Sequence, residues 1–244
     1  GPVALNNNLQ NWNGDFTFTG TNDLDMGEGA VALSATRAIT VSNGNFTIGG
    51  VISGSTFGLA KNGDGTMILS GANTYTGATT INAGTLAVRG GSAIIDTATV
   101  QLANASGVVL SVLGNEMIGS LQGGGTTGGE VNIASGQTFT VVETGSQTFA
   151  GSIAGFGSFT KSGSGTLALS GTNTHAGGTT LNSGTLVAQN ASAMGVGVVT
   201  LNGGRLVAEM SLNLAALNWA DGDIRLAPAA GTVLHITGGL NNAG

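Results

Sequence analysis

The chain has 244 residues, of which 45 are glycine and only 7% are charged, and its formal net charge is −6. A hydrophobic content of 41% argues against disorder, and the presence of only two prolines argues against a collagen-like chain. The six scattered basic residues exclude an electrostatic surface for nucleic acid, and the absence of cysteine excludes disulfides and thiolate metal sites.

No targeting segment or membrane helix is predicted. No apolar run approaches the ~18 residues that a membrane helix needs. No charged segment followed by an apolar one opens the chain, as it would in a signal peptide. Gly1-Pro2 resembles the scar of a cleaved tag, so we expect residues 3–244 to be a fragment of a longer protein.

Short runs of alternating apolar and polar residues begin near the start of the chain. Phe16 and Phe18 flank Thr17, and Val31–Leu33 repeats the pattern. Runs of this kind, bounded by Gly or Asn, predict short strands with one buried face. Strand starts recur about every seven to ten residues, so three strands would make a coil of about 20 to 30 residues. Stacked coils of this kind predict a β-solenoid of about ten coils and ~50 Å in length.

A repeated unit dominates the sequence. Residues 59–88 read LAKNGDGTMILSGANTYTGATTINAGTLAV, and residues 159–188 read FTKSGSGTLALSGTNTHAGGTTLNSGTLVA. The identical positions are mainly glycines and their polar neighbours, whereas Met67 is exchanged for Leu167 and Ile81 for Leu181. Such a pattern indicates a fixed backbone around a core that accepts any apolar side chain of suitable size.

This unit resembles the autotransporter-associated β-strand repeat, also called the passenger-associated transport repeat. The second copy departs from the repeat at His175 and Ala176, where Tyr-Thr is expected. The resemblance implies an all-β protein, a right-handed parallel β-helix (β-solenoid) forming a single elongated domain over residues 3–244. The matching positions of the first copy are Leu59, Lys61, Gly63, Gly65, Thr66, Leu69 to Gly71, Asn73 to Gly77, Thr79, Ile81 and Gly84 to Leu86.

Two further segments leave alternatives open. The glycine-rich residues 123–129 are interpreted as a wide turn between coils, with a loop that projects out of the solenoid as the alternative. Residues 211–217 could form one helical turn or a strand, and the alternation of Leu212 with Leu214 favours the strand.

Few side chains are candidates for a site. Trp12 and Trp219 could stack on sugar rings, but the interpretation we favour is that each indole packs over a coil edge. The acids at 23/25 and 221/223 are paired at i, i+2, which places both members on one strand face. We interpret Asp23 with Asp25, and Asp221 with Asp223, as solvated faces, with a calcium site as the alternative.

The two histidines have no Cys, His or acid at ligand spacing, so we predict no metal site at His175 or His235. We interpret His175 as a surface turn residue. Because the coil length looks irregular, we expect no strict ladder of outward threonines, which an ice-binding face would need. The outward threonines that raise the question are Thr17, Thr19, Thr40, Thr47, Thr138 and Thr140.

We therefore assign no catalytic, cofactor-binding or metal-binding residue. The resemblance implies a non-enzymatic segment of a secreted or surface-exposed bacterial passenger that supports passenger folding and secretion and acts as a stalk or adhesin. Export through the oxidising periplasm suits a chain without cysteine. The expected partner is a host-surface glycan or a matrix protein, or a second copy of the chain, with no nucleic acid and no membrane insertion. The alternative is a carbohydrate-binding or carbohydrate-active β-helix.

Overall fold

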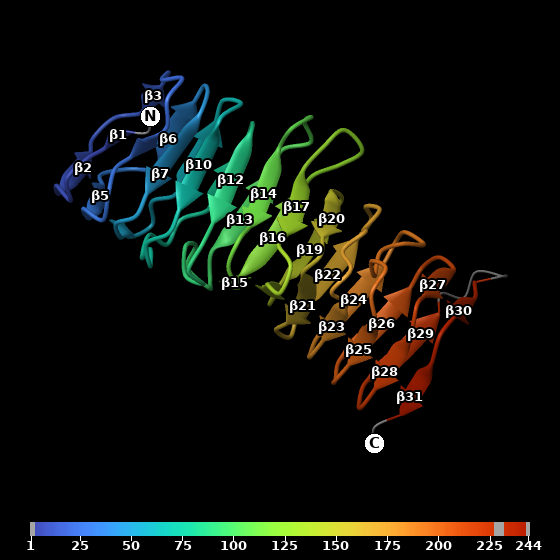
Figure 1. Cartoon of the computed structure of the whole chain (residues 1–244). Helices are drawn as coiled ribbons and strands as arrows, with labels where there is room; N and C mark the ends of the chain where they lie inside the picture. The colour runs from blue at the N-terminus through green and yellow to red at the C-terminus, as the bar shows by residue number, and fades with distance from the viewer. Residues whose placement is uncertain (1–2, 227–231, 243–244) are drawn as a thin grey trace.

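The computed structural model describes residues 3–226 and 232–242, and in this part of the chain it contains strands and turns but no helix. The chain winds as a stack of coils with its two ends at opposite ends of the stack (Figure 1). Successive coils pair through parallel strands, for example β10 with β12 and β18 with β21. The predicted all-β parallel β-solenoid is therefore confirmed, whereas its right-handed winding stays a prediction. Gly1 and Pro2 lie outside the described residues.

Side one of the solenoid is an eleven-stranded sheet with one strand from each coil, which gives about eleven coils where about ten were expected. Its strands, from the N-terminal end, are β3 (Phe16–Phe18), β6 (Arg37–Val41), β9 (Leu59–Asn62), β11 (Thr79–Ile81), β13 (Thr99–Leu102), β16 (Ser120–Gly123), β19 (Ser146–Phe149), β22 (Thr166–Leu169), β24 (Thr185–Ala188), β26 (Arg205–Ala208) and β29 (Asp223–Leu226).

Side two begins as an eight-stranded sheet. Beyond its last strand, Thr174 and Ala176 continue the stack through backbone bonds to Ile153 and Gly155. A two-stranded sheet, β27 (Leu212–Leu214) with β30 (Leu234–Ile236), follows later in the chain. The eight strands are β1 (Val3–Ala4), β4 (Leu24–Asp25), β7 (Asn45–Ile48), β10 (Thr66–Leu69), β12 (Thr85–Val88), β14 (Val109–Val112), β17 (Glu130–Ile133) and β20 (Ser152–Gly155).

Side three has two sheets joined by extended segments. The first sheet contains β2 (Gln10–Trp12), β5 (Val31–Leu33) and β8 (Ile52–Ser53). Residues 73–76 stack on β8, because Thr74 donates to the carbonyl of Ile52. The second sheet contains β15 (Glu116–Ile118), β18 (Thr138–Val142), β21 (Ser158–Ser162), β23 (Thr179–Leu181), β25 (Val199–Leu201), β28 (Leu217–Trp219) and β31 (Leu240–Asn242).

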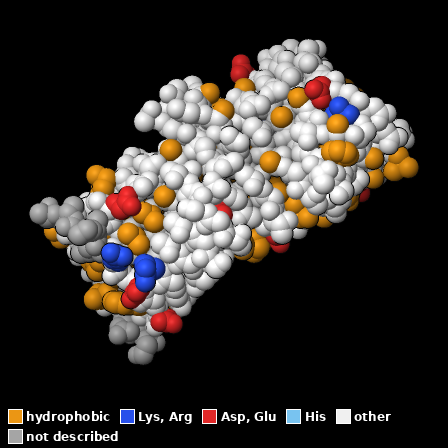
Figure 2. Space-filling model, turned by 180° about the vertical axis from the view of Figure 1, so that it is seen from behind, with side chains coloured by type: hydrophobic (Ala, Val, Ile, Leu, Met, Phe, Trp, Pro, Cys, Tyr) orange, Lys and Arg blue, Asp and Glu red, His pale blue; other side chains and the backbone are white. Residues whose placement is uncertain are grey.

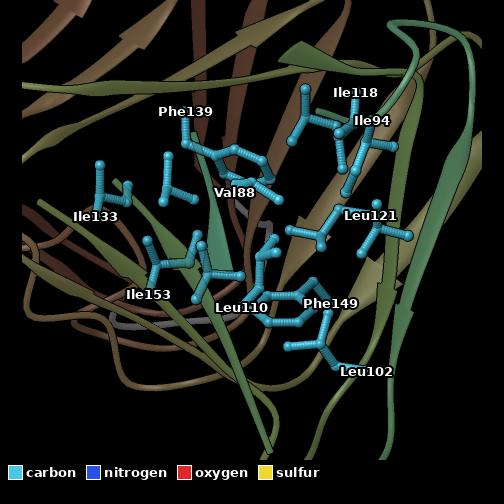
Figure 3. Close-up of a cluster of buried hydrophobic side chains, with 14 of the residues drawn as sticks. Val88, Ile94, Leu102, Leu110, Ile118, Leu121, Ile133, Phe139, Phe149 and Ile153 are labelled. Atoms are coloured by element: carbon cyan, nitrogen blue, oxygen red, sulfur yellow. The ribbon is translucent and has the colours of Figure 1, made fainter. Parts of the chain in front are cut away.

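The core is one continuous column of inward-facing apolar side chains. Met67 and Leu69 are fully buried, whereas Ile68 between them is half-buried, as the alternation predicted. Parallel pairing in register places equivalent inward residues above one another from coil to coil. Figure 3 shows part of this column, where Leu110 of side two and Phe149 of side one point toward one another. Coils that bury apolar side chains only against their neighbours are typical of a solenoid.

The two segments for which the sequence left alternatives, residues 123–129 and 211–217, form a wide turn and a strand. Residues 124–129 form a wide turn after β16, in which Gly125 donates to the carbonyl of Gly128. Thr127 donates its backbone N–H to Asn104 of the preceding coil at 2.9 Å, so the two wide turns stack. They form two of the longer green loops at the edge of the stack in Figure 1. Within residues 211–217, Leu212–Leu214 is a strand, so that prediction is confirmed too.

The two repeats occupy different sides of the solenoid. The first repeat places β9 on side one, β10 on side two and residues 73–77 on side three. The second repeat places β21 on side three, β22 on side one and residues 173–177 on side two. The same sequence pattern is therefore rotated by one side, about a third of a turn, between the two copies.

Candidate functional site

Each repeat buries a lysine at the corner after its first strand. The ammonium group of Lys61 donates to three backbone carbonyls, and that of Lys161 does the same one repeat later. Two of the carbonyls belong to the lysine's own turn and the third belongs to the turn of the next coil, so each lysine ties two coils together. The acceptors are Asn62 (3.0 Å), Gly63 (2.6 Å) and Ala83 (3.0 Å) for Lys61, and Ser162 (2.6 Å), Gly163 (3.0 Å) and Ser183 (3.3 Å) for Lys161.

The electrostatics of the two lysines are also alike. Burial lowers the pKa of Lys61 to about 8, although Asp64 acts in the opposite sense. Burial likewise lowers the pKa of Lys161 to about 8, with Glu143 acting in the opposite sense. Both ammonium groups therefore remain mostly charged at neutral pH, with carbonyl dipoles as their direct partners.

A buried asparagine in each repeat joins three successive coils. The Oδ1 atom of Asn73 accepts the backbone N–H of Ile52 at 2.7 Å, and its Nδ2 group donates to the carbonyl of Ala93 at 2.7 Å. Asn173 makes the same two bonds to the coils before and after it, at 2.8 and 2.7 Å. The side-chain amide thereby satisfies an N–H and a C=O that would be buried without partners, which would be costly.

The third repeated contact lies two residues further on. The Tyr75 hydroxyl lies 2.8 Å from Oγ1 of Thr79, and the Nε2 atom of His175 lies 2.8 Å from Oγ1 of Thr179. Both rings are fully buried. The interpretation of His175 as a surface turn residue is therefore wrong, because the ring takes the place of the tyrosine in the core.

A buried carboxyl group continues the row of cross-links on side three. Glu116 is 3% exposed, and it accepts the backbone N–H of Ile94 at 2.6 Å and that of Ala93 at 3.3 Å. Desolvation raises the pKa of Glu116 to about 7, with the two backbone bonds acting in the opposite sense. Glu116, Lys61 and Asn73 were not predicted from the sequence as cross-links. Lys61 and Asn73 could have been recognised, because each is identical in both copies and lies at a position where the strand alternation points the side chain inward.

The outer face of the second side-three sheet carries a threonine ladder. Thr140, Thr160, Thr180 and Thr200 are paired in register across four coils. Beside them, Asn202 donates to Asn182 at 2.9 Å. The expectation that no strict threonine ladder would form is therefore wrong for this part of the chain. We call these four threonines the threonine ladder.

The surface near the ladder is uncharged and partly apolar. Phe156 and Val196, at the corner between sides two and three, are 76% and 57% exposed. In the view of Figure 2, most of the surface is uncharged and the Lys and Arg atoms gather toward the two ends. A separate hollow of about 590 Å³ lies beside the wide turn of residues 124–129. Its lining of glycines and hydroxyl groups includes one carboxylate, Glu130.

The two tryptophans differ in exposure. Trp12 is buried, packs edge-on against Phe16 with ring centroids 5.0 Å apart, and donates to Gln10. Trp219 is 36% exposed and donates its indole N–H to the carbonyl of Gly222 at 3.1 Å. The packing of Trp12 agrees with the interpretation that we favoured for it.

The paired acids are engaged in local contacts. Asp23 accepts both the backbone and side-chain N–H groups of Asn45, which lower its pKa, and Asp25 accepts the N–H of Gly27. Asp221 accepts from Gly222, and Asp223 lies 3.5 Å from Arg205. Among the described residues, no group of three or more His, Cys, Asp or Glu side chains is placed to hold a metal ion.

No helix in the described part of the chain is long and apolar enough to cross a membrane. The passenger-associated transport repeat matches residues 59–88 and 159–188. The chain is also 34% identical over 152 residues to the Adhesin BmaC autotransporter of Brucella suis biovar 1 (strain 1330). That match covers 60% of this chain and only 4% of the relative. No solved structure is significantly similar to the chain. The resemblance drawn from the sequence is confirmed: the chain carries two passenger-associated transport repeats and is an autotransporter passenger-like β-solenoid.

Proposed function

We propose that this chain is a non-enzymatic, surface-exposed segment of a bacterial autotransporter passenger. It forms one elongated domain that supports folding during secretion and serves as a stalk or adhesin. The observation that carries the proposal is the pair of repeats with the same buried cross-links. The relative of the chain is named as an adhesin, which supports the adhesive part of the proposal.

The cross-links suit a chain that folds as it emerges from a membrane. Each coil contacts only its neighbours, so folding can proceed coil by coil without contacts between coils that are far apart in the stack. Asn73 requires both the preceding and the following coil, because it bonds Ile52 and Ala93. A slipped coil would leave these buried groups unpaired, and the repeats therefore favour the correct register.

A coil-deletion experiment tests the folding role. Leu59 pairs with Thr79, so deletion of residues 59–78 removes one whole coil together with Lys61 and Asn73. Arg205 pairs with Asp223, so deletion of residues 205–222 removes one coil that has neither a repeat nor a buried polar cross-link, and it is the matched control. With the chain as the passenger of an autotransporter, we expect several-fold less protease-accessible protein at the cell surface for the first deletion. Equal display of the two variants would contradict the folding role.

The threonine ladder is the face that we assign to adhesion. It is neutral, regular and rich in hydroxyl groups, which suits hydrogen bonding to a glycan or a matrix protein. The test is binding of the purified chain to an array of glycans and matrix proteins. Substitution of Thr160 and Thr180 by lysine should weaken binding to the component that the wild type recognises by about tenfold or more. The control places lysines at Gln101 and Gln122, which face outward on side one. An equal loss in both variants, or no loss in either, would reject this face.

A further inference from the structure

The two repeats differ in one chemical respect at a position that is otherwise equivalent. Tyr75 in the first repeat and His175 in the second each lie 2.8 Å from the threonine hydroxyl four residues later. The phenol gains no proton in mildly acidic solution, whereas an imidazole does. The same buried contact is therefore made once by a group that resists acid and once by a group that can respond to it.

The hydrogen bonds determine which nitrogen of His175 carries the proton. Thr179 has one hydroxyl hydrogen, and it donates this hydrogen to the carbonyl of Met194 at 2.9 Å. Its oxygen must then accept a hydrogen from Nε2 of His175. In the neutral imidazole the proton is accordingly on Nε2 and the lone pair is on Nδ1.

The Nδ1 atom has no hydrogen-bond partner among the described residues. The backbone of Gly195 closes this side of the ring, since a Cβ atom added at Gly195 would lie 2.8 Å from Nδ1. A second proton on Nδ1 would therefore place a charge on a fully buried ring, at an atom that now has no hydrogen-bond partner among the described residues.

No charged partner compensates the imidazolium among the elements packed on the ring. Phe159 contacts it edge-on, with ring centroids 6.1 Å apart. Of β20, β21, β23 and residues 193–196, only β21 carries a titratable group, Lys161, whose ammonium is bonded to corner carbonyls. Glu143 influences Lys161 electrostatically, not the imidazole. Burial lowers the pKa of His175 to about 4, although the backbone of Ile153 acts in the opposite sense.

We propose that His175 makes the second repeat sensitive to acid: its neutral ring holds neighbouring coils together, and protonation releases them. We call this contact the acid-labile lock. Protonation of the buried ring loosens the coils that meet at residues 153, 175 and 194, while the first repeat, closed by Tyr75, stays folded. The direction follows from linkage. An unfolded histidine binds a proton near pH 6.5, whereas the folded one binds it only near pH 4, so stability is lost as the pH falls between these values. Local opening should increase on the order of 10²-fold across this window.

Amide hydrogen exchange of the whole chain at pH 7 and pH 4.5, corrected for intrinsic exchange, tests the lock. We expect protection to fall at residues 173–181 and 193–201 and to persist at residues 73–81 and 93–101. His175→Tyr and His175→Gln supply non-titrating donors and should abolish the loss. The reciprocal Tyr75→His, which keeps His175, should add a loss of protection at the first repeat. Equal loosening of both repeats in the wild type would overturn the proposal.

A measurement on the unmodified protein keeps the test independent of how the variants fold. The sequence has only two histidines, so the ring resonances of His175 and the exposed His235 can be followed separately by NMR. We expect the His175 ring to remain neutral until the pH falls below about 5 and then to lose its folded signal. A ring that titrates reversibly near pH 6.5 without loss of the fold would overturn the lock.

Discussion

The buried asparagines should be among the most sensitive polar positions of the solenoid. Replacing Asn73 by leucine keeps the volume of the side chain but removes the two bonds to Ile52 and Ala93. Each orphaned backbone group costs about 1–3 kcal/mol, and the added apolar burial offsets part of the sum. We therefore expect Asn73→Leu to lower the free energy of unfolding by about 2–4 kcal/mol. Asn173→Leu should behave in the same way.

The assay is urea unfolding followed by far-UV circular dichroism, combined with amide exchange at Ile52 because a solenoid can open in segments. Asn82→Leu is the matched control. Its amide donates to Asn62 at 2.8 Å on the exposed surface, so its effect should stay within about 0.5 kcal/mol. If Asn73→Leu costs less than the control, or leaves exchange at Ile52 unchanged, the cross-link does not stabilise the stack as argued.

Two further predictions concern ionisable groups. For Lys61, whose pKa is lowered to about 8, stability should rise between about pH 8 and 10.5, because only the unfolded lysine stays charged there. Lys61→Met should remove that part of the rise in pH-dependent urea unfolding, and an unchanged rise would contradict the assignment. For Glu116, whose pKa is raised to about 7, stability should fall as the pH rises from about 4.5 to 7. Glu116→Gln should remove this fall, and a variant with the wild-type pH profile would show that the carboxyl group is ionised in the folded chain.

The opposite signs of two groups explain why local measurements are needed. Between about pH 4.5 and 6.5, acidification favours the fold through Glu116 and disfavours it through His175. The two effects offset one another in a global unfolding curve. They occur in different coils, so amide exchange separates them. In the Glu116→Gln variant, the acid sensitivity of the second repeat should become visible in the global curve as well.

The strand pattern was predictable because a half-buried strand has a simple period. Alternation placed Met67 and Leu69 inward, and the structure buries both. The same rule also placed Lys61 inward, two residues after the buried Leu59. From the sequence, Lys61 was nevertheless grouped with the polar neighbours of the repeated glycines and not with the core, although a charge can be buried when it is fully bonded. Its three carbonyl partners come from two coils, and such partners cannot be seen in a single stretch of sequence.

The threonine ladder was missed for a different reason. The coil length was judged over the whole chain, where wide turns such as residues 124–129 make it irregular. Between Thr140 and Thr200 the coils are regular, and threonine recurs at every coil. A local period would have found the ladder. The burial of His175 could also have been predicted, because the alignment of the two copies places His175 at the position of Tyr75.

The rotation of the second repeat shows what the repeat itself encodes. A separation of about 100 residues, close to five coils of 20, predicts that both copies start on the same side. The wide turns at residues 103–108 and 124–129 lengthen their coils without contributing a further side. The 100 residues between the two copies therefore complete fewer than five coils, and the second copy starts one side earlier. Even so, its lysine, asparagine and ring make the same contacts as in the first copy. The buried contacts depend only on neighbouring coils, whereas the direction in which the outer residues point depends on everything between the repeats. A chain of this kind can therefore change its turns, and with them the direction of its outer faces, without disturbing the cross-links that hold each repeat together.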